Sequence, residues 1–348
     1  MIAVLGECVA DAFAEHEPGP GAAHRSPGDG PTDAPARPGN GLGSGAGSSP
    51  AGSGGPVGEL TLRVHAGGGP ANTAVALARL GTPTRFLGRL SGDVFGRLFR
   101  DRLASSGVDL SACVEAAEPS TLAVASLDER GQAAYGFHAE GTADWAWTAA
   151  ELDSRDLGGA SCLHTGSLAL VREPGSEAVE AFAAAATERA TVSIDPNVRP
   201  SLAPRVAYDV TRWCAFADIL KLSEDDLAFL APDEPVERVC DLWHAAGAAL
   251  VIVTRGGAGA LVSLNGARAE VAAPRVTVVD TVGAGDAFTA GLLHRLDRRG
   301  LLGGRLDGLD LETAVDAAAF AARVAALTCA VAGANPPWAR DLDDRASA

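Results

Sequence analysis

Short apolar runs alternate with stretches of helical composition along most of this chain, and this alternation restricts the fold more than any other feature. Candidate strands lie at 2–5, 85–88, 162–164, 191–194, 219–222 and 250–254. Candidate helices lie at 70–80, 94–106, 176–189, 224–230, 236–246, 284–296 and 311–327. The pattern is typical of a layered α/β fold with a mostly parallel sheet. At 348 residues, the chain is long enough for one large domain or two ordinary ones.

Two parts of the chain break this rhythm. Segments 60–65, 121–127 and 133–137 show strand-like alternation, and we predict that they form a small antiparallel sheet, a lid over about 59–66 and 121–139. Residues 17–58 are almost entirely Gly, Pro, Ala and Ser, so we predict a disordered insertion that loops out of the fold. A partner-binding role is the alternative for this insertion.

Composition and charge exclude several classes of function. The 28 Lys and Arg residues against 44 Asp and Glu give a net charge of −16, which argues against nucleic-acid binding. The six cysteines are scattered without a C-x-x-C pair, so neither a zinc site nor a disulfide framework is predicted. We see no signal peptide and no apolar run long enough to span a membrane, and we expect a cytoplasmic protein.

The string D-T-V-G-A-G-D-A-F at 280–288 is the most informative motif. Gly283, Ala284 and Gly285 form a small-residue turn that opens into a predicted helix, whose first N–H groups lack intrahelical partners. These N–H groups and the helix dipole favour an anion such as phosphate. Asp286 adds a carboxylate that can accept a proton beside that anion. The alternative is an ordinary Gly-rich turn whose Asp favours the helix dipole.

A second cluster, G-G-G-P-A-N at 67–72, points to the same kind of chemistry. Three glycines let a ligand approach the backbone closely, and Asn72 can donate and accept hydrogen bonds. Alone, the cluster could be a plain helix-entry loop. Together, 67–81 and 280–288 resemble the two signatures of the ribokinase-like (PfkB) carbohydrate kinase family. The resemblance implies one kinase domain over 1–340, with a mostly parallel central sheet flanked by helices and a small β-sheet lid.

The resemblance also implies ATP-dependent phosphorylation of a sugar hydroxyl and assigns roles to particular residues. Asp286 matches the catalytic base, and Gly283, Ala284 and Gly285 match the anion hole. The sugar-binding positions are Asp11, Gly67, Gly68, Asn72 and Arg199.

On the nucleotide side, Lys221 and Glu224 occupy the place of the family's N-x-x-E motif, where Glu224 would organise Mg²⁺ through water. Thr254, Gly256 and Gly259 resemble its nucleotide-binding turn. Asp280 aligns with a monovalent-cation site of some relatives, so K⁺ is left open beside ATP and Mg²⁺, and orienting the turn is the conservative role. The chain contains no G-x-x-x-x-G-K-[ST] P-loop.

The sugar is indicated by D-P-N-V-R at 195–199, which resembles fructokinases and 2-keto-3-deoxygluconate kinases. Ala139 stands where the second group carries an Arg for the acid substrate's carboxylate. We therefore predict a kinase of the fructokinase-like branch that acts on a neutral hexose, fructose first. A sugar-acid kinase is the alternative enzyme, and an inactive ligand-binding relative acting through partners is the alternative of another class. A homodimer is left open.

Overall fold

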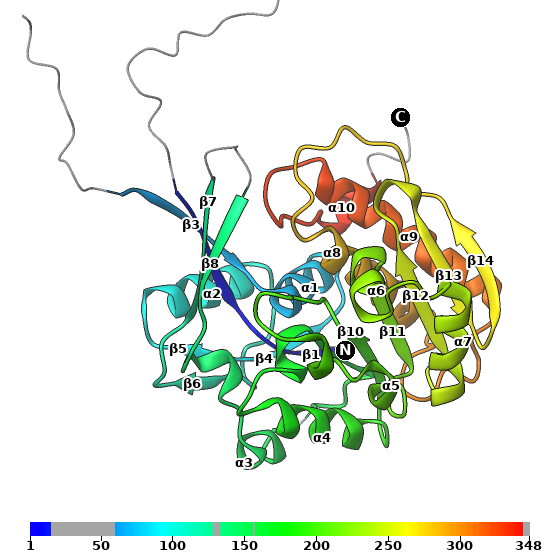
Figure 1. Cartoon of the computed structure of the whole chain (residues 1–348), viewed down its shortest axis with the longest axis horizontal. Helices are drawn as coiled ribbons and strands as arrows, with labels where there is room; N and C mark the ends of the chain where they lie inside the picture. The colour runs from blue at the N-terminus through cyan, green and yellow to red at the C-terminus, as the bar shows by residue number, and fades with distance from the viewer. Residues whose placement is uncertain (15–59, 128–132, 156, 344–348) are drawn as a thin grey trace, which may run out of the picture.

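A computed structural model describes residues 1–14, 60–127, 133–155 and 157–343 of the chain (Figure 1). The predicted insertion at 17–58 lies outside the described residues, as do residues 128–132 between the predicted lid segments 121–127 and 133–137.

The central sheet has eight strands and is parallel except at one edge. Its order is β14 (Ala267–Val271), β13 (Ala260–Leu264), β12 (Leu250–Thr254), β11 (Ile219–Ser223), β10 (Thr191–Asp195), β9 (Cys162–Gly166), β1 (Ile2–Leu5) and β4 (Thr84–Leu87). Strands β4 to β12 pair in parallel register, as expected for strands that alternate with helices. The predicted α/β fold with a mostly parallel sheet is confirmed.

Helices cover both faces of this sheet (Figure 1). One core contains residues of α1 (Gly69–Arg79), α2 (Val94–Ser105), α8 (Ala284–Arg298), α9 (Leu311–Cys329) and α10 (Ala339–Asp343). The other contains residues of α3 (Ala149–Asp153), α4 (Ser176–Ala186), α5 (Val210–Trp213), α6 (Glu224–Leu230) and α7 (Val236–Ala246). Successive strand residues alternate between the two cores, with Ile2 in the first and Ala3 in the second.

A separate four-stranded sheet projects from this body and forms the lid, at the upper left of Figure 1. Its order is β3 (Leu62–Gly67), β2 (Val9–Ala14), β7 (Thr121–Leu127) and β8 (Ala133–His138). Strand β2 was not predicted, and it makes the sheet mixed, because it pairs in parallel with β7. Strands β5 (Arg89–Ser91) and β6 (Val114–Ala116) form a further two-stranded sheet.

The hairpin β13–β14 was also missed by the sequence analysis. Its turn is Asn265-Gly266, and both residues have positive φ, 47° and 90°. Asn-Gly is the preferred pair for a two-residue turn of this hand, so the signal was present in the sequence. The hairpin forms the antiparallel edge of the central sheet.

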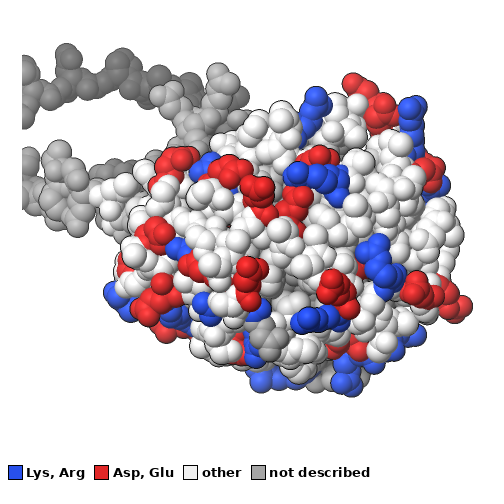
Figure 2. Space-filling view, turned by 90° about the horizontal axis from the view of Figure 1, so that it is seen from below, with Lys and Arg blue, Asp and Glu red and all other residues white. Residues whose placement is uncertain are grey.

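Two broader expectations concern surfaces. On the face drawn in Figure 2, basic side chains lie interspersed with acidic ones rather than in one continuous patch. None of the helices in the described ranges has the length and apolar character needed to cross a membrane.

Candidate active site

A pocket of about 1110 Å³ lies between the carboxyl ends of the central strands, the start of α8 and the lid. The predicted site residues line it, except Gly67, Ala284, Gly259 and Asp280. The two signature segments meet here, because Nδ2 of Asn72 donates to Oδ2 of Asp286 at 2.9 Å across 214 residues of sequence. This position outside the carboxyl ends of parallel strands is where open α/β sheets bind ligands.

The predicted anion site lies at the start of α8. Gly283 is the N-cap with φ of 76°, and a Cβ atom there would lie 2.6 Å from the Cβ of Ala334, so the turn requires glycine. Among the described residues, the N–H groups of Gly285 and Asp286 donate to no protein acceptor, whereas that of Ala284 donates to the Thr281 carbonyl at 3.2 Å. The free donors of this helix start are therefore those of Gly285 and Asp286.

Asp280 holds this turn in place. Its Oδ1 accepts from the N–H of Val282 at 3.1 Å, and its Oδ2 accepts from the N–H of Gly333 at 2.8 Å. The Asp280 carboxylate thus connects the backbone at Val282, just before the Gly283 turn, with the backbone at Gly333, after α9. This geometry matches the conservative expectation that Asp280 orients the turn, and a monovalent cation at Asp280 stays a prediction.

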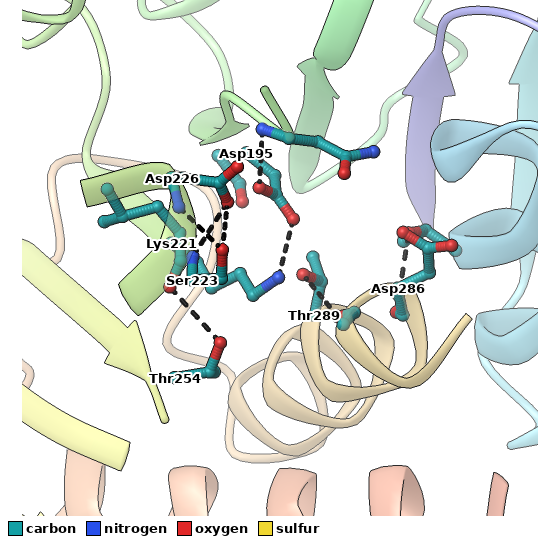
Figure 3. Close-up of polar contacts among 12 residues, drawn as sticks. Asp195, Lys221, Ser223, Asp226, Thr254, Asp286 and Thr289 are labelled. Carbon is teal, nitrogen blue, oxygen red and sulfur yellow. Dashed lines mark hydrogen bonds and ion pairs between the residues drawn. The ribbon is translucent and has the colours of Figure 1, made fainter. Parts of the chain in front are cut away.

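Asp286 lies in the first turn of α8, beside the free N–H groups (Figure 3). Burial raises the pKa of this carboxyl group from 3.8 to about 6, against the opposing effects of Asn72 and Lys221. At neutral pH the group is therefore ionised, but close enough to its pKa to accept and release a proton. A Cβ atom added at Gly69 would lie 3.2 Å from Oδ1 of Asp286, so the glycine loop at 67–69 packs directly against the Asp286 carboxylate.

Lys221 forms a buried ion pair next to the same helix start. Its Nζ donates to Oδ2 of Asp195 at 2.8 Å, and the two side chains are 4% and 8% exposed (Figure 3). Burial works against the ammonium group, but Asp195, with help from Asp286, holds its pKa above the usual value. Because a Cβ atom on Gly285 would lie 3.0 Å from Nζ, the positive charge lies directly beside the predicted anion site.

Asp11 lies on strand β2 of the lid, opposite His65 in the register of β3. A Cβ atom on Gly67 would lie only 2.0 Å from its Oδ2, so the carboxylate packs against the glycine loop. Burial raises its pKa from 3.8 to about 6, and Arg199 and Arg102 act in the opposite direction. Asp11 is therefore a residue of the lid, and its role in binding the sugar stays a prediction.

Arg199 extends from the D-P-N-V-R loop after β10 and is exposed at the pocket. Its Nη1 donates to the carbonyl oxygens of Val198 at 3.0 Å and Asn197 at 3.4 Å, and its backbone N–H donates to the hydroxyl of Tyr208 at 2.9 Å. It also lowers the pKa of Asp11 and Asp286. The guanidinium is thus close enough to both acids to affect them, and a guanidinium is a group that can pair with an anion.

On the nucleotide side, Glu224 and Asp226 have different environments. Glu224 is exposed at the pocket rim, whereas Asp226 is buried and forms a capping box with Ser223 at the start of α6 (Figure 3). Asp226 also accepts from the N–H of Val198 at 2.8 Å. The Ser-x-x-Asp spacing of this box was readable in the sequence and was missed.

Thr254 and Gly256 line the pocket, and Oγ1 of Thr254 donates to the Leu222 carbonyl at 3.3 Å. Gly259 lies behind them, with φ of 97° and a would-be Cβ only 1.9 Å from the Val271 carbonyl oxygen. It therefore shapes the turn instead of facing the pocket. In the part of the chain that the structure describes, no cluster of three or more His, Cys, Asp or Glu residues could hold a metal ion alone.

Further residues of this pocket, among them Glu7, Ser167 and Asn197, were not predicted as site residues. Asn197 has φ of 38°, and its Nδ2 would lie 2.5 Å from a Cβ atom on Gly69, which links the D-P-N-V-R loop to the glycine loop. The left-handed backbone of an Asn after a Pro is a turn signal that was available. For Glu7, the only signal was its position between Gly6 and Asp11.

Comparisons with known proteins show which family this chain resembles. The family model described as pfkB family carbohydrate kinase matches residues 53–340. A fructokinase from Rhizobium leguminosarum bv. trifolii is 38% identical over 250 residues, covering 71% of this chain and 76% of that protein.

Two solved structures have the same fold. A fructokinase from Xylella fastidiosa with bound ATP has a TM-score of 0.79 at 26% identity, covering 100% of this chain and 99% of that chain. A fructokinase from Vibrio cholerae O395, bound to fructose, ADP and calcium ion, has a TM-score of 0.71 at 26% identity, covering 96% and 94% of the two chains. Because the family model spans most of its residues, this chain belongs to the pfkB family of carbohydrate kinases.

Proposed function

We propose that this chain transfers the γ-phosphoryl group of ATP to a hydroxyl of a neutral hexose, with fructose as the first candidate. The observation that carries the proposal is the contact between the two signatures at Asp286, beside the free N–H groups of Gly285 and Asp286. A proton acceptor next to fixed donors for a phosphate is the arrangement that phosphoryl transfer to an alcohol needs.

Each part of the pocket has a defined task in this reaction. Asp286 accepts the proton of the attacking hydroxyl, and Asn72 holds its carboxylate in position through Oδ2. The N–H groups at the start of α8 and the nearby ammonium of Lys221 stabilise the charge on the transferred phosphoryl group. Asp11 accepts hydrogen bonds from hydroxyls of the sugar. These residue roles are proposals from geometry and charge.

The donor set also fits Mg-ATP. Mg²⁺ keeps several waters and is usually bound through one or two carboxylates and substrate phosphates, so a cage of protein ligands is not needed. We propose that Glu224, exposed at the rim, contacts such waters, and that Thr254 and Gly256 contact the nucleotide. When bound, Mg²⁺ would neutralise phosphate charge during transfer.

The lid favours a neutral sugar. The described lid residues that line the pocket are Val9, Asp11, Phe13, Thr121, Ala123 and Phe137, and the charged one among them is acidic. Ala139 is buried, and its carbonyl oxygen accepts from Trp145 and Arg172. A substrate carboxylate at the lid would therefore be repelled by the Asp11 carboxylate, and none of these lining residues is basic and could pair with it.

Arg199 favours the second candidate, a kinase for 2-keto-3-deoxygluconate or another sugar acid. Its exposed guanidinium lies near Asp11 and Asp286 and could pair with a carboxylate of the substrate. We rank this function second because the same group can contact the transferred phosphate.

The proposal is tested by incubating the purified chain with Mg-ATP and fructose and measuring ADP and sugar phosphate together. We expect equimolar formation of the two products. Fructose binding without any sugar phosphate would instead support the inactive ligand-binding relative. A homodimer, a cytoplasmic location and a K⁺ requirement stay predictions.

A further inference from the structure

Glu7 lies on the short link between β1 and β2, where the chain passes from the central sheet into the lid. Its side chain is 2% exposed, yet it belongs to the pocket wall together with Ser167 and Arg199. Burial raises the pKa of its carboxyl group to about 7, and a hydrogen bond with Ser167 acts in the opposite direction. The reaction described above does not use this acid.

One oxygen of the Glu7 carboxyl group lacks a partner. Oε2 is buried and forms no hydrogen bond with any of the described residues. A buried polar atom without a partner is costly, so native proteins rarely keep one unless it serves a ligand, a water molecule or a reaction. Because Glu7 belongs to the wall of the sugar pocket, a ligand hydroxyl can supply the missing hydrogen bond.

The neighbouring acid Asp144 provides a contrast. It is also buried, but its Oδ1 accepts from the N–H of Cys8 at 2.9 Å and its Oδ2 accepts from Oγ1 of Thr121 at 2.6 Å. It does not line the pocket, and its bonds connect Cys8, the residue before β2, with Thr121, the first residue of β7. Asp144 is therefore a structural acid, whereas Glu7 has hydrogen-bonding capacity left over.

The glycine loop at 67–69 places Glu7 among the acids assigned to the sugar. A Cβ atom added at Gly67 would lie 2.0 Å from Oδ2 of Asp11, and one added at Gly69 would lie 3.2 Å from Oδ1 of Asp286. Between them, a Cβ atom added at Gly68 would lie 2.5 Å from the carbonyl oxygen of Glu7. The backbone of Glu7 thus contacts the middle of the loop whose ends contact Asp11 and Asp286. A sugar lying along this loop passes all three residues.

We propose that Glu7 is a further substrate-binding residue, whose free carboxyl oxygen hydrogen-bonds a sugar hydroxyl other than the one that receives the phosphate. This inference rests on the proposed sugar kinase function. It adds a specificity element, because a sugar without that hydroxyl leaves Oε2 buried and unpartnered, as it is without substrate.

The experiment compares Glu7→Gln and Glu7→Leu with the unchanged protein on fructose and on a set of monodeoxy fructoses. We expect Glu7→Leu to lower kcat/KM for fructose about 10- to 100-fold, the range for losing one buried hydrogen bond. For the deoxy sugar that lacks the contacted hydroxyl, Glu7→Leu should lower kcat/KM by less than about 3-fold, because the hydrogen bond to Glu7 is already missing. Glu7→Gln keeps hydrogen-bonding atoms, so its kcat/KM for fructose should lie between the values of Glu7→Leu and of the unchanged protein. The KM for ATP should be unchanged in both variants.

Asp144→Asn is the matched control, and it should affect all sugars by the same factor. If Glu7→Leu lowers kcat/KM equally for every sugar, or not at all, the proposed contact is wrong. Calorimetric titration with the same sugars measures the contact without turnover. Should the unchanged protein bind fructose but fail to phosphorylate it, the proposed function fails, while the binding difference between fructose and the deoxy sugars still decides the role of Glu7.

Discussion

Replacing Asp286 by Asn should separate activity from stability. The substitution keeps the size of the side chain and an oxygen that can accept from Nδ2 of Asn72, while the proton acceptor is lost. General base catalysis typically contributes about 10²- to 10⁴-fold, so we expect kcat to fall by at least about 100-fold. Nucleotide binding should change little, because the N–H groups at the start of α8 remain.

The same variant should be more stable than the unchanged protein at pH 8. Folding raises the pKa of Asp286 from 3.8 to about 6, so the ionised carboxylate disfavours the folded state. At about 1.4 kcal/mol per pKa unit, this cost reaches at most about 3 kcal/mol. It is full above the folded-state pKa and disappears as the pH falls toward the unfolded-state value. The gain in stability should therefore be largest at pH 8 and absent near pH 4.

A coupled assay for ADP measures kcat, and thermal or urea unfolding at pH 8 and pH 4 measures stability. Asp297→Asn is the control, because Asp297 lies near the opposite end of the same helix and does not line the pocket. It should leave kcat unchanged. An Asp286→Asn variant with kcat within about 10-fold of the unchanged protein would refute the base role, given the usual size of that contribution.

Three further predictions concern the pH dependence of kcat, the ion pair of Lys221 with Asp195, and residues 18–56. The rate constant kcat should fall as the pH drops below about 6, because protonation of Asp286 removes the proton acceptor. A pH-rate profile measures this fall, and a flat profile down to pH 5 would contradict the prediction. Lys221→Met should destabilise the fold by about 3 kcal/mol in urea unfolding, since it leaves the buried Asp195 unpaired, and adding Asp195→Asn should recover most of the loss. Deleting residues 18–56 should leave the melting temperature nearly unchanged, because the pairing of β2 with β3, from Val9–Gly67 to Ala14–Leu62, lies outside the deleted residues. A loss of many degrees would show that the segment packs on the fold.

The main elements of the fold were predictable from local patterns. The parallel strands are apolar runs that alternate with helices, and the helix start at 283–286 carries its own Gly-rich signal. Strand β2 was missed because half of its residues are alanine, which has low strand propensity. Ala10 and Ala12 are fully buried there, so tertiary packing decides the structure of this segment.

The site was predictable to a similar extent. The meeting of Asn72 with Asp286 follows from two motifs that can be read separately. The ion pair of Lys221 with Asp195 could not be read from spacing, because it depends on neighbouring strands brought together by the sheet. The unpartnered oxygen of Glu7 is likewise a result of packing, since no local pattern indicates which buried acid lacks a partner.

The central claim is that this pfkB family member phosphorylates a neutral hexose. A competition assay tests it most directly, with equal concentrations of fructose and 2-keto-3-deoxygluconate, limiting Mg-ATP, and quantification of both sugar phosphates by mass spectrometry. We expect hexose phosphate to dominate the products, because Asp11 is the charged group that the described lid residues present to the sugar. Dominance of the phosphorylated sugar acid would contradict the account and would assign Arg199 to the substrate carboxylate.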